Sequence, residues 1–474
     1  MKRYVLGLDL GTSGVKLCLT DESGAITAEA EAGYPMIADA NGKAEQDTAL
    51  WFKAIAAACK ELSHLIPDVY MKVEAVALSA QMPTLVVTNG RGNALMNAVT
   101  WRDARADDIG RAQLEKWGAQ THFSITGVRL DGRYIVPMYL YQRGHGLSNA
   151  DILLLSAKDY IYFALTGVAA TDPTTASGYG VFDLAKGGWN DGLCASAGIS
   201  PDMLPAVYPV MSAPGRLGAA AEALGLPSDI PVVLGCADSV AGAVAMDAAG
   251  EGTIAAIWGT STALLAMTPT PLRTSGHGYF ITPMHVEGLF ALEADMLSTG
   301  LSISWLGELL GRSPEELLQL AAAVPRGCDG LRFHPYLAGG EQSVLWDPLL
   351  TGSICGLRSG HGAPHLARAL FEGICFETRR CIDAFQRGGF SPERMVCTGH
   401  ASASPFFMQL LADVCSLPCA AAGSENGSAY GAARLAGIYA GFPDVDEGEN
   451  ITLAYAPDAS ASAEYEKLYQ VYII

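Results

Sequence analysis

Long apolar runs, a signal peptide and paired cysteines are all missing from this sequence. No stretch reaches the roughly 18 uninterrupted apolar residues that a membrane-spanning helix needs, and Asp9 interrupts the first apolar segment before a signal-peptide core can form. The 11 cysteines are odd in number and scattered, with no Cys-x-x-Cys, as is typical of reduced, buried thiols. We therefore expect a soluble, cytoplasmic protein without disulfides.

Positive charge is scarce as well. The chain has 30 lysines and arginines against 49 aspartates and glutamates, which gives a formal net charge of −19. A negative field of this size repels phosphate backbones and anionic lipid surfaces. We therefore expect neither nucleic acid nor a membrane as a partner.

Several familiar catalytic motifs are also absent. The chain has no Walker A phosphate loop, no Gly-x-Ser-x-Gly elbow and no complete Gly-x-Gly-x-x-Gly fingerprint, and its nine histidines are scattered. These absences argue against a P-loop ATPase, a serine hydrolase, a Rossmann dehydrogenase and a zinc enzyme.

What the chain does contain predicts a large α/β protein. Its 474 residues suggest two or three domains, and a hydrophobic content of 50% is enough for sizeable cores. Apolar segments typical of strands alternate with amphipathic segments typical of helices. The predicted strands are 4–8, 15–20, 73–78, 151–155 and 231–236, and the predicted helices are 48–62, 158–165 and 364–386. Such alternation favours mixed sheets covered by helices.

Two predicted hairpins have the same Gly-Thr-Ser bend. The bends are Gly11, Thr12 and Ser13 in the first half of the chain, and Gly259, Thr260 and Ser261 in the second. Related hairpins near the start of each half predict duplicated domains, 1–232 and 233–474, that face each other across a cleft. A chance match of three small residues is the alternative.

Each bend is a candidate phosphate site. Glycine lets the chain turn sharply, so backbone N–H groups and hydroxyls can point at a phosphate. The first bend also has Asp9 before it and Lys16 after it, which supply a carboxylate for a metal and a positive charge. For either bend taken alone, an ordinary glycine turn is the more common interpretation.

Further polar residues follow predicted strands. Asp238 ends an apolar strand and opens a helix of small residues, where it is suited to accept a proton, hold a metal or simply cap the helix. Segments 81–84 and 100–105 contain residue types that bind polyols, although Trp101 is equally suited to a core and Asp103 with Arg105 to an exposed ion pair of little value. Residues 395–404 predict a strand, a small-residue turn and a helix, which suits an adenine ring or a plain turn.

In chain order, these segments resemble the FGGY carbohydrate kinases, and among them most closely the xylulokinases. The resemblance extends from Asp9 to about Gly437 and rests on the colinear order of motifs that are weak one by one. The motifs are 7–16, 45–47, 81–82, 101–105, 158–160, 165–167, 183–186, 189–191, 238 with 241–243, 259–261, 335–339, 372–373, 411–414 and 431–436.

The resemblance implies two ribonuclease-H-like domains of the actin and hexokinase superfamily. It also implies transfer of the γ-phosphoryl group of ATP to a sugar hydroxyl with the help of Mg²⁺. D-xylulose, giving D-xylulose 5-phosphate, is the leading substrate, and gluconate, ribulose or another polyol is the nearest alternative. Dimers are common in that family, so a homodimer is one option for this chain.

The resemblance also assigns roles to residues. It makes Asp238 the general base and places Asp9 and Asp238 at the metal. It assigns Gln81, Met82, Asp103, Asp238 and Ser239 to the sugar, Gly11, Thr12, Ser13, Lys16, Gly259, Thr260 and Ser261 to the phosphates, and Gly399, His400, Ala401 and Ser404 to the adenosine.

The chain departs from the xylulokinase pattern at positions of recognition. Pro83 replaces a histidine, Arg102 an asparagine, and His400 a glycine, while Ser239 and Gln342 are further departures. These changes affect the expected sugar and leave the expected reaction intact. Two other functions stay open, an ATPase switch of the same superfamily and a degenerate kinase that senses sugar. Release of ADP only in the presence of a sugar would distinguish the kinase from both.

Overall fold

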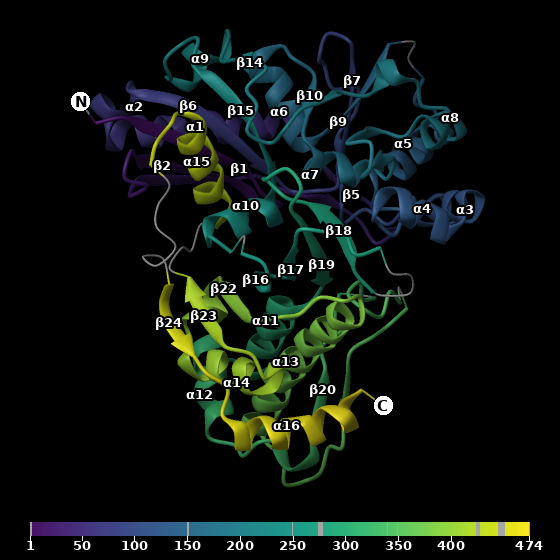
Figure 1. Ribbon diagram of the computed structural model, residues 1–474, viewed down its shortest axis with the longest axis vertical. Coiled ribbons are helices and arrows are strands. Elements are labelled where there is room, and N and C mark those ends of the chain that lie inside the picture. The colour runs from purple at the N-terminus through teal and green to yellow at the C-terminus, as the bar shows by residue number, and fades with distance from the viewer. Residues whose placement is uncertain are drawn as a thin grey trace. The chain divides into compact units, whose positions relative to one another are not determined.

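The chain forms two compact units, which are described here one by one from a computed structural model (Figure 1). The first unit contains Met1–Ala245, Thr282–Leu289 and Asn426–Asp446, and the second contains Met246–Ile281, Phe290–Glu425 and Glu447–Ile474. The residues that the structure describes are 2–148, 151–248, 250–273, 278–338, 340–347, 349–422, 427–443 and 451–473.

The first unit is built on a six-stranded sheet with the order β14-β15-β6-β1-β2-β3. The strands are β1 (Tyr4–Leu10), β2 (Gly14–Asp21), β3 (Ile26–Gly33), β6 (Val73–Ala80), β14 (Gly215–Arg216) and β15 (Pro231–Ala237). β1, β2 and β3 are antiparallel, whereas β6 is parallel to β1 and β15 is parallel to β6. Every residue of β1 is buried, because helices cover both faces of the sheet.

Helix α1 (Thr48–Leu65) covers one face of this sheet. Asp47 caps it by accepting a hydrogen bond from the amide of Ala49, and its buried side chains share one apolar core with alternate residues of β1. Helices α10 (Asp238–Ala245) and α15 (Gly427–Tyr439) pack on the other face, so a segment near the end of the chain completes the first unit.

A second sheet of the first unit carries the loops that were predicted to bind polyols. Its order is β4-β5-β8-β7-β9, and the strands are β4 (Ile37–Ala38), β5 (Ala44–Gln46), β7 (Thr84–Asn89), β8 (Ala98–Thr100) and β9 (Ile152–Ser156). A separate apolar cluster joins this sheet to α5 (Ile135–Gly144). The other helices of this unit include α2 (Pro67–Tyr70), α3 (Asp107–Trp117), α4 (Ala119–Thr126), α6 (Ala157–Thr166), α7 (Pro173–Ala176), α8 (Asp191–Ala197) and α9 (Ala220–Leu224).

The second unit repeats the strand pattern of the first sheet. Its sheet has the order β18-β19-β17-β16-β22-β23-β24. The strands are β16 (Thr253–Trp258), β17 (Thr262–Thr268), β18 (Phe280–Pro283), β19 (Phe290–Met296), β22 (Arg394–Thr398), β23 (Cys419–Ala422) and β24 (Ile451–Tyr455), and the division into units falls within β18. β16, β17 and β19 are antiparallel, and β16, β22 and β23 are parallel. The predicted pair of related hairpins is therefore confirmed.

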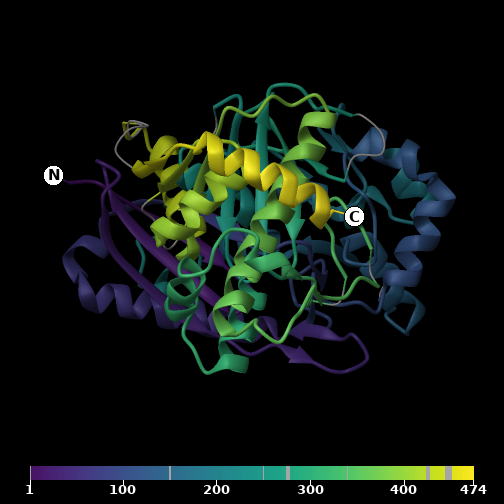
Figure 2. The ribbon, with the colours of Figure 1, turned by 90° about the horizontal axis from the view of Figure 1, so that it is seen from below.

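The described residues of the second unit form the helices α11 (Thr299–Leu310), α12 (Pro314–Ala322), α13 (Ala363–Arg387), α14 (Pro405–Cys415) and α16 (Ala459–Tyr472). α16, drawn in yellow in Figure 2, is anchored by tyrosines. The hydroxyl of Tyr465 donates to Glu372 over 3.1 Å, and that of Tyr469 donates to Asp383 over 2.7 Å. The helix that ends the chain is thus joined to α13.

The division into units differs from the expected division at 232 and 233. The first unit continues to Ala245, because β15 is hydrogen-bonded to β6 in the first sheet and α10 follows it directly. Asp238 therefore belongs to the first unit.

The cysteines agree with the sequence-based expectation. All eleven are free, and all but Cys355 are buried. Within the described ranges, no helix combines the length and apolar character that crossing a bilayer requires.

Candidate active site

Three predicted site residues lie at one edge of the first sheet. Asp9 is near the carboxyl end of β1, Gln81 directly follows β6, and Asp238 directly follows β15. These strands are parallel neighbours, and the last residues of β1 and β15 both pair with Ala80 at the end of β6. Carboxyl ends of adjacent parallel strands are where α/β folds place ligands. Strand pairing therefore brings these three residues together, although they lie far apart in the sequence.

A bulge in β15 sets the position of Asp238. Strand pairing is interrupted between Val233 and Cys236, and Gly235 has a φ of 67°. A Cβ atom on Gly235 would lie 1.7 Å from the carbonyl oxygen of Leu78, so only glycine fits there. After the bulge, Asp238 opens α10 with its side chain half-buried, and its Oδ1 accepts a hydrogen bond from the amide of Ser239 over 2.9 Å.

Asp9 is a buried carboxylate with an unused oxygen. Only 8% of the residue is exposed, and Oδ1 has no hydrogen-bond partner among the described residues. Burial raises the pKa of Asp9 to about 6, while the Ser79 hydroxyl and the charge of Lys16, its pairing partner on β2, oppose that rise. An unpaired carboxylate oxygen at this edge fits the oxygen ligands that Mg²⁺ prefers. Asp9 is therefore suited to hold the metal.

Substitution of Asp9 by asparagine is expected to stabilise the metal-free protein. A raised pKa means that the folded state binds the proton more tightly than the unfolded state. The free energy of unfolding therefore falls as the pH rises from about 4 to about 6, and above pH 6 it stays at this lower value. The difference between a pKa of about 6 and the ordinary value of 3.8 corresponds to about 3 kcal/mol. Thermal unfolding without Mg²⁺ at pH 8 should therefore show a higher midpoint for Asp9→Asn, and the gain should shrink toward pH 5.

Asp21 provides a control of opposite sign in the same hairpin. Burial raises its pKa, but hydrogen bonds from Ser23 and Lys2 outweigh burial, and the net pKa is lowered. Asp21→Asn should therefore lower the midpoint at pH 8. Equal midpoints for Asp9→Asn and the wild type would contradict the burial penalty at Asp9.

The orientation of the Gln81 amide follows from its partners. The indole N–H of Trp51 can only donate, and it bonds Oε1 of Gln46 over 3.1 Å. Nε2 of Gln46 then donates to the carbonyl of Thr12, and Nε2 of Gln81 donates to the same Gln46 Oε1, both over 2.8 Å. Oε1 of Gln81 is buried without a hydrogen-bond partner in the described part of the chain. Gln81 is thus suited to accept a hydrogen bond from a ligand hydroxyl.

Hydrogen bonds from neighbouring residues hold the first Gly-Thr-Ser bend in place. The amide of Gly11 donates to the carbonyl of Gly14 over 2.9 Å, and the hydroxyl of Tyr34 donates to the carbonyl of Gly11. The indole N–H of Trp101 bonds Thr12 Oγ1 over 3.2 Å. Trp101 is half-buried beside the bend and is not a core residue. Ser13 is exposed and Lys16 is half-buried, and a role of either residue at phosphate stays a prediction.

The second bend lies in the second unit together with the predicted adenosine segment. The amide of Gly259 donates to the carbonyl of Ser261 over 2.9 Å, and the carbonyl of Thr260 accepts from the amide of Leu301 over 3.0 Å. Gly399 has a φ of 97°, and a Cβ atom there would lie 1.9 Å from the carbonyl oxygen of Trp258. This close approach requires glycine and brings Gly399 to the start of the second bend.

The other predicted adenosine residues follow Gly399 in a short 3₁₀ turn, His400–Ala403. Ala401 is half-buried, and the side chain of His400 lies outside the described residues. Ser404 caps α14, because its Oγ accepts a hydrogen bond from the amide of Phe407 over 3.3 Å. A role of these residues at adenosine stays a prediction.

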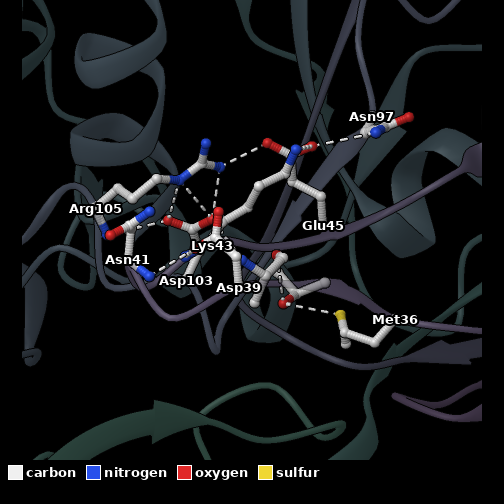
Figure 3. A network of polar contacts seen from close by, with 10 residues as sticks. Met36, Asp39, Asn41, Lys43, Glu45, Asn97, Asp103 and Arg105 are labelled. Atoms are coloured by element: carbon white, nitrogen blue, oxygen red, sulfur yellow. Dashed lines mark hydrogen bonds and ion pairs between the residues drawn. The ribbon is translucent and has the colours of Figure 1, made fainter.

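Asp103 and Arg105 form a buried network, and the interpretation as an exposed pair is wrong (Figure 3). Asp103 is 2% exposed, and Nη2 of Arg105 lies 2.6 Å from Asp103 Oδ2 and 2.7 Å from Glu45 Oε1. Asp103 Oδ2 also accepts from the amide of Ala44 over 2.9 Å. Burial raises the pKa of Glu45, but bonds from Arg105, Asn97 and Lys43 outweigh it and lower the net pKa. Asp103 thus fixes the loop after β8 to β5, and its contact with sugar stays a prediction.

Met82 and Ser239 lie beside these groups. Met82 is half-buried after Gln81, and the Met82–Pro83 peptide bond is cis. Ser239 is half-buried as the second residue of α10. Both belong to the first unit with Asp9 and Asp238.

Sequence reasoning missed the residues that support the site. Gln46 bonds Gln81, Glu45 pairs with Arg105, and Tyr34 bonds the first bend. The motif 45–47 included Gln46 and Glu45 but assigned them no role. Sequence reasoning also overlooked the spacing of His361, which precedes α13, and His365, which lies in its first turn. In the described ranges, no three His, Cys, Asp or Glu residues are grouped to hold a metal ion.

Comparison with known proteins gives one consistent result. Residues 4–245 match the N-terminal domain, and residues 254–440 the C-terminal domain, of the FGGY family of carbohydrate kinases. The chain is 29% identical to a xylulose kinase from Bacillus subtilis over 99% of its own length and 96% of that protein.

Solved structures point the same way. A gluconate kinase from Lactobacillus acidophilus has a TM-score of 0.90 at 27% identity, covering 100% of this chain and 97% of that one. A ligand-bound xylulose kinase from the same organism also has a TM-score of 0.90 at 27% identity, covering 99% of this chain and 97% of that one. The fold is therefore that of the two-domain α/β proteins of this family.

Proposed function

Because the chain belongs to the FGGY family of carbohydrate kinases, we propose that it transfers the γ-phosphoryl group of ATP to D-xylulose and forms D-xylulose 5-phosphate. The observation that carries this proposal is the gathering of Asp9, Gln81 and Asp238 at the carboxyl ends of three adjacent parallel strands. A base, a hydroxyl acceptor and a metal carboxylate are the side chains that phosphoryl transfer to an alcohol requires.

In the proposed mechanism, Asp238 takes the proton from the attacking sugar hydroxyl. Gln81 Oε1 accepts a hydrogen bond from a neighbouring hydroxyl and orients the sugar. Mg²⁺, when bound, neutralises charge on the phosphate oxygens, and Asp9 with Asp238 would hold it. We assign the sugar loops, the first phosphate bend and the base to the first unit. We assign the second phosphate bend and the adenosine segment, including Gly399, to the second unit.

One observation favours an aldonate such as gluconate as a second candidate substrate. Arg102 is exposed next to Trp101, which touches the first bend, and a guanidinium binds a carboxylate in bidentate fashion. Pro83 stands where the xylulokinase pattern has a histidine, and it offers neither a side-chain donor nor an N–H group to a sugar hydroxyl. The similarity to a gluconate kinase structure supports the same candidate.

A coupled ADP-release assay over ketoses, aldonates and polyols tests the proposal. We expect ADP release to depend on the sugar and to be fastest with D-xylulose. If gluconate is the better substrate, Arg102→Gln should lower kcat/KM for gluconate about tenfold or more and leave D-xylulose unchanged, because only gluconate carries the carboxylate. ADP release without any acceptor would instead support an ATPase switch. Tight ATP binding without turnover would support a sugar sensor.

Two further properties complete the proposal. Eleven free cysteines support a reducing, cytoplasmic compartment. A homodimer is proposed as one option, and light scattering coupled to size-exclusion chromatography measures the oligomeric state directly.

A further inference from the structure

A fully buried ion pair lies in the first unit and is not part of the machinery described above. Nζ of Lys158, on α6, lies 2.9 Å from Oδ2 of Asp172 and 3.4 Å from Oδ1 of Asp159. The side chains of Lys158 and Asp172 are 1% and 0% exposed. Each buried charge loses its hydration, a cost that the attraction between the two ions has to offset, and apolar residues often fill such a space at least as stably. Stability alone therefore does not explain why this ion pair is present.

Hydrogen bonds connect this ion pair to the residue before Asp238. Oδ1 of Asp172 accepts from the amide of Thr174 over 2.9 Å and from its hydroxyl over 2.5 Å. Oγ1 of Thr174 in turn accepts from the amide of Ala237 over 2.8 Å. Thr174 is 0% exposed and Ala237 is 1% exposed, so water does not compete for these bonds.

The charge on Asp172 fixes the direction of these bonds. A carboxylate can only accept, so the Thr174 hydroxyl has to donate its single proton to Asp172. A lone pair of Thr174 Oγ1 is then left for the amide of Ala237. A buried N–H group needs a partner, and a hydroxyl oriented by a charge supplies one of fixed geometry. Lys158 holds the carboxylate in place from the opposite side.

We propose that Thr174, with Lys158 and Asp172 behind it, is a positioning residue that fixes the backbone at Ala237 and thereby aims Asp238 at the sugar hydroxyl. This inference rests on the proposed role of Asp238 as the general base. A displaced base acts through a longer or misaligned hydrogen bond, and a misplacement of about 1 Å can lower a rate about 10²-fold. The network therefore acts on kcat more than on substrate binding.

Two neighbouring threonines supply matched controls. The hydroxyls of Thr171 and Thr175 are also buried, but neither has a hydrogen-bond partner among the described residues. Valine has nearly the shape of threonine, so a threonine-to-valine change at either position removes a buried hydroxyl without breaking a link to Asp238.

The test compares Thr174→Val, Thr174→Ser and Thr171→Val in the full-length protein, with the best sugar of the panel. We expect Thr174→Val to lower kcat at least tenfold while the KM values for ATP and sugar change less than about threefold. Thr174→Ser should restore kcat to within about threefold, because the hydroxyl returns, and Thr171→Val should match the wild type. A purely structural role would lower the unfolding midpoint and leave kcat per folded molecule unchanged.

Three outcomes would overturn the inference: a wild-type kcat for folded Thr174→Val, a failure of serine to rescue it, or an equal loss in Thr171→Val. If Thr174→Val does not fold, Asp172→Asn takes its place, since it keeps the side-chain shape and removes the charge that orients the hydroxyl. Its kcat should fall at least tenfold, and a wild-type kcat would overturn the inference. Asp238→Asn is measured in parallel. Its loss of turnover beside a fully active Thr174→Val would refute the positioning role alone, whereas turnover in Asp238→Asn would refute the proposed base.

Discussion

Replacement of Asp238 by asparagine is expected to lower kcat by about 10²–10⁴-fold or more, the usual contribution of a general base. Asparagine keeps the size and polarity of the side chain but cannot take the proton from the attacking hydroxyl. ATP should still bind, since the proposed phosphate bends and adenosine segment do not include Asp238 and Asp9 is also proposed to hold the metal. The measurement is steady-state ADP release with the best sugar, together with the Kd for ATP by calorimetry.

The control for Asp238→Asn is Asp229→Asn. The side chain of Asp229 is about eight-tenths exposed and forms an ion pair with Arg216. The two substitutions remove the same negative charge, one at the proposed base and the other at the surface. Asp229→Asn should retain the wild-type kcat, because exposed ion pairs contribute little. Near-normal turnover of Asp238→Asn would show that another group takes the proton. An equal loss of turnover in both variants would assign the effect to net charge.

A single methyl group at Gly431 is expected to disrupt the first unit. A Cβ atom there would lie 1.8 Å from the carbonyl oxygen of Ala241 and 2.7 Å from its carbonyl carbon, and these backbone atoms of α10 cannot rotate away. Overpacking of side chains costs about 1–3 kcal/mol, and a backbone clash should cost about 3 kcal/mol or more. Because α10 begins at Asp238, any movement that relieves the clash also displaces the proposed base, so kcat should fall as well.

Gly437→Ala is the matched control for Gly431→Ala in the same helix. Its Cβ atom would lie 3.4 Å from the ring of Phe442, which is an ordinary contact. Since alanine favours a helix over glycine by about 1 kcal/mol, this variant should be neutral or slightly stabilised. Urea unfolding followed by circular dichroism measures both variants. Similar unfolding midpoints for the two would contradict the tight approach of α15 to α10.

The fold class was predictable from the sequence because its signals are local. Strand 4–8 was expected and β1 spans Tyr4–Leu10, while helix 48–62 was expected and α1 spans Thr48–Leu65. The glycine bends at Gly11 and Gly259 also marked both hairpins correctly. Apolar periodicity and turn chemistry act over a few residues, so they can be seen without knowledge of distant contacts.

Much of the site depends on contacts between residues far apart in the sequence. The buried surroundings of Asp103 follow from its pairing with Arg105, Glu45 and Ala44, and the local sequence is equally compatible with an exposed ion pair. The acceptor at Gln81 is oriented by Gln46, whose own amide is set by Trp51. None of these partners has a spacing that a local pattern reveals.

By itself, the sequence determined an acidic α/β protein with duplicated hairpins and with Asp9, Gln81 and Asp238 at the ends of apolar strands. Only the tertiary structure decided that β15 joins the first sheet, so that Asp238 lies in the same unit as Asp9, and that α15 completes this unit from near the end of the chain. The physical reason is that strand pairing and helix packing satisfy hydrogen bonds and bury apolar surface between distant segments. The residues proposed to carry chemistry can be read along the chain, but the contacts that orient them exist only once it has folded.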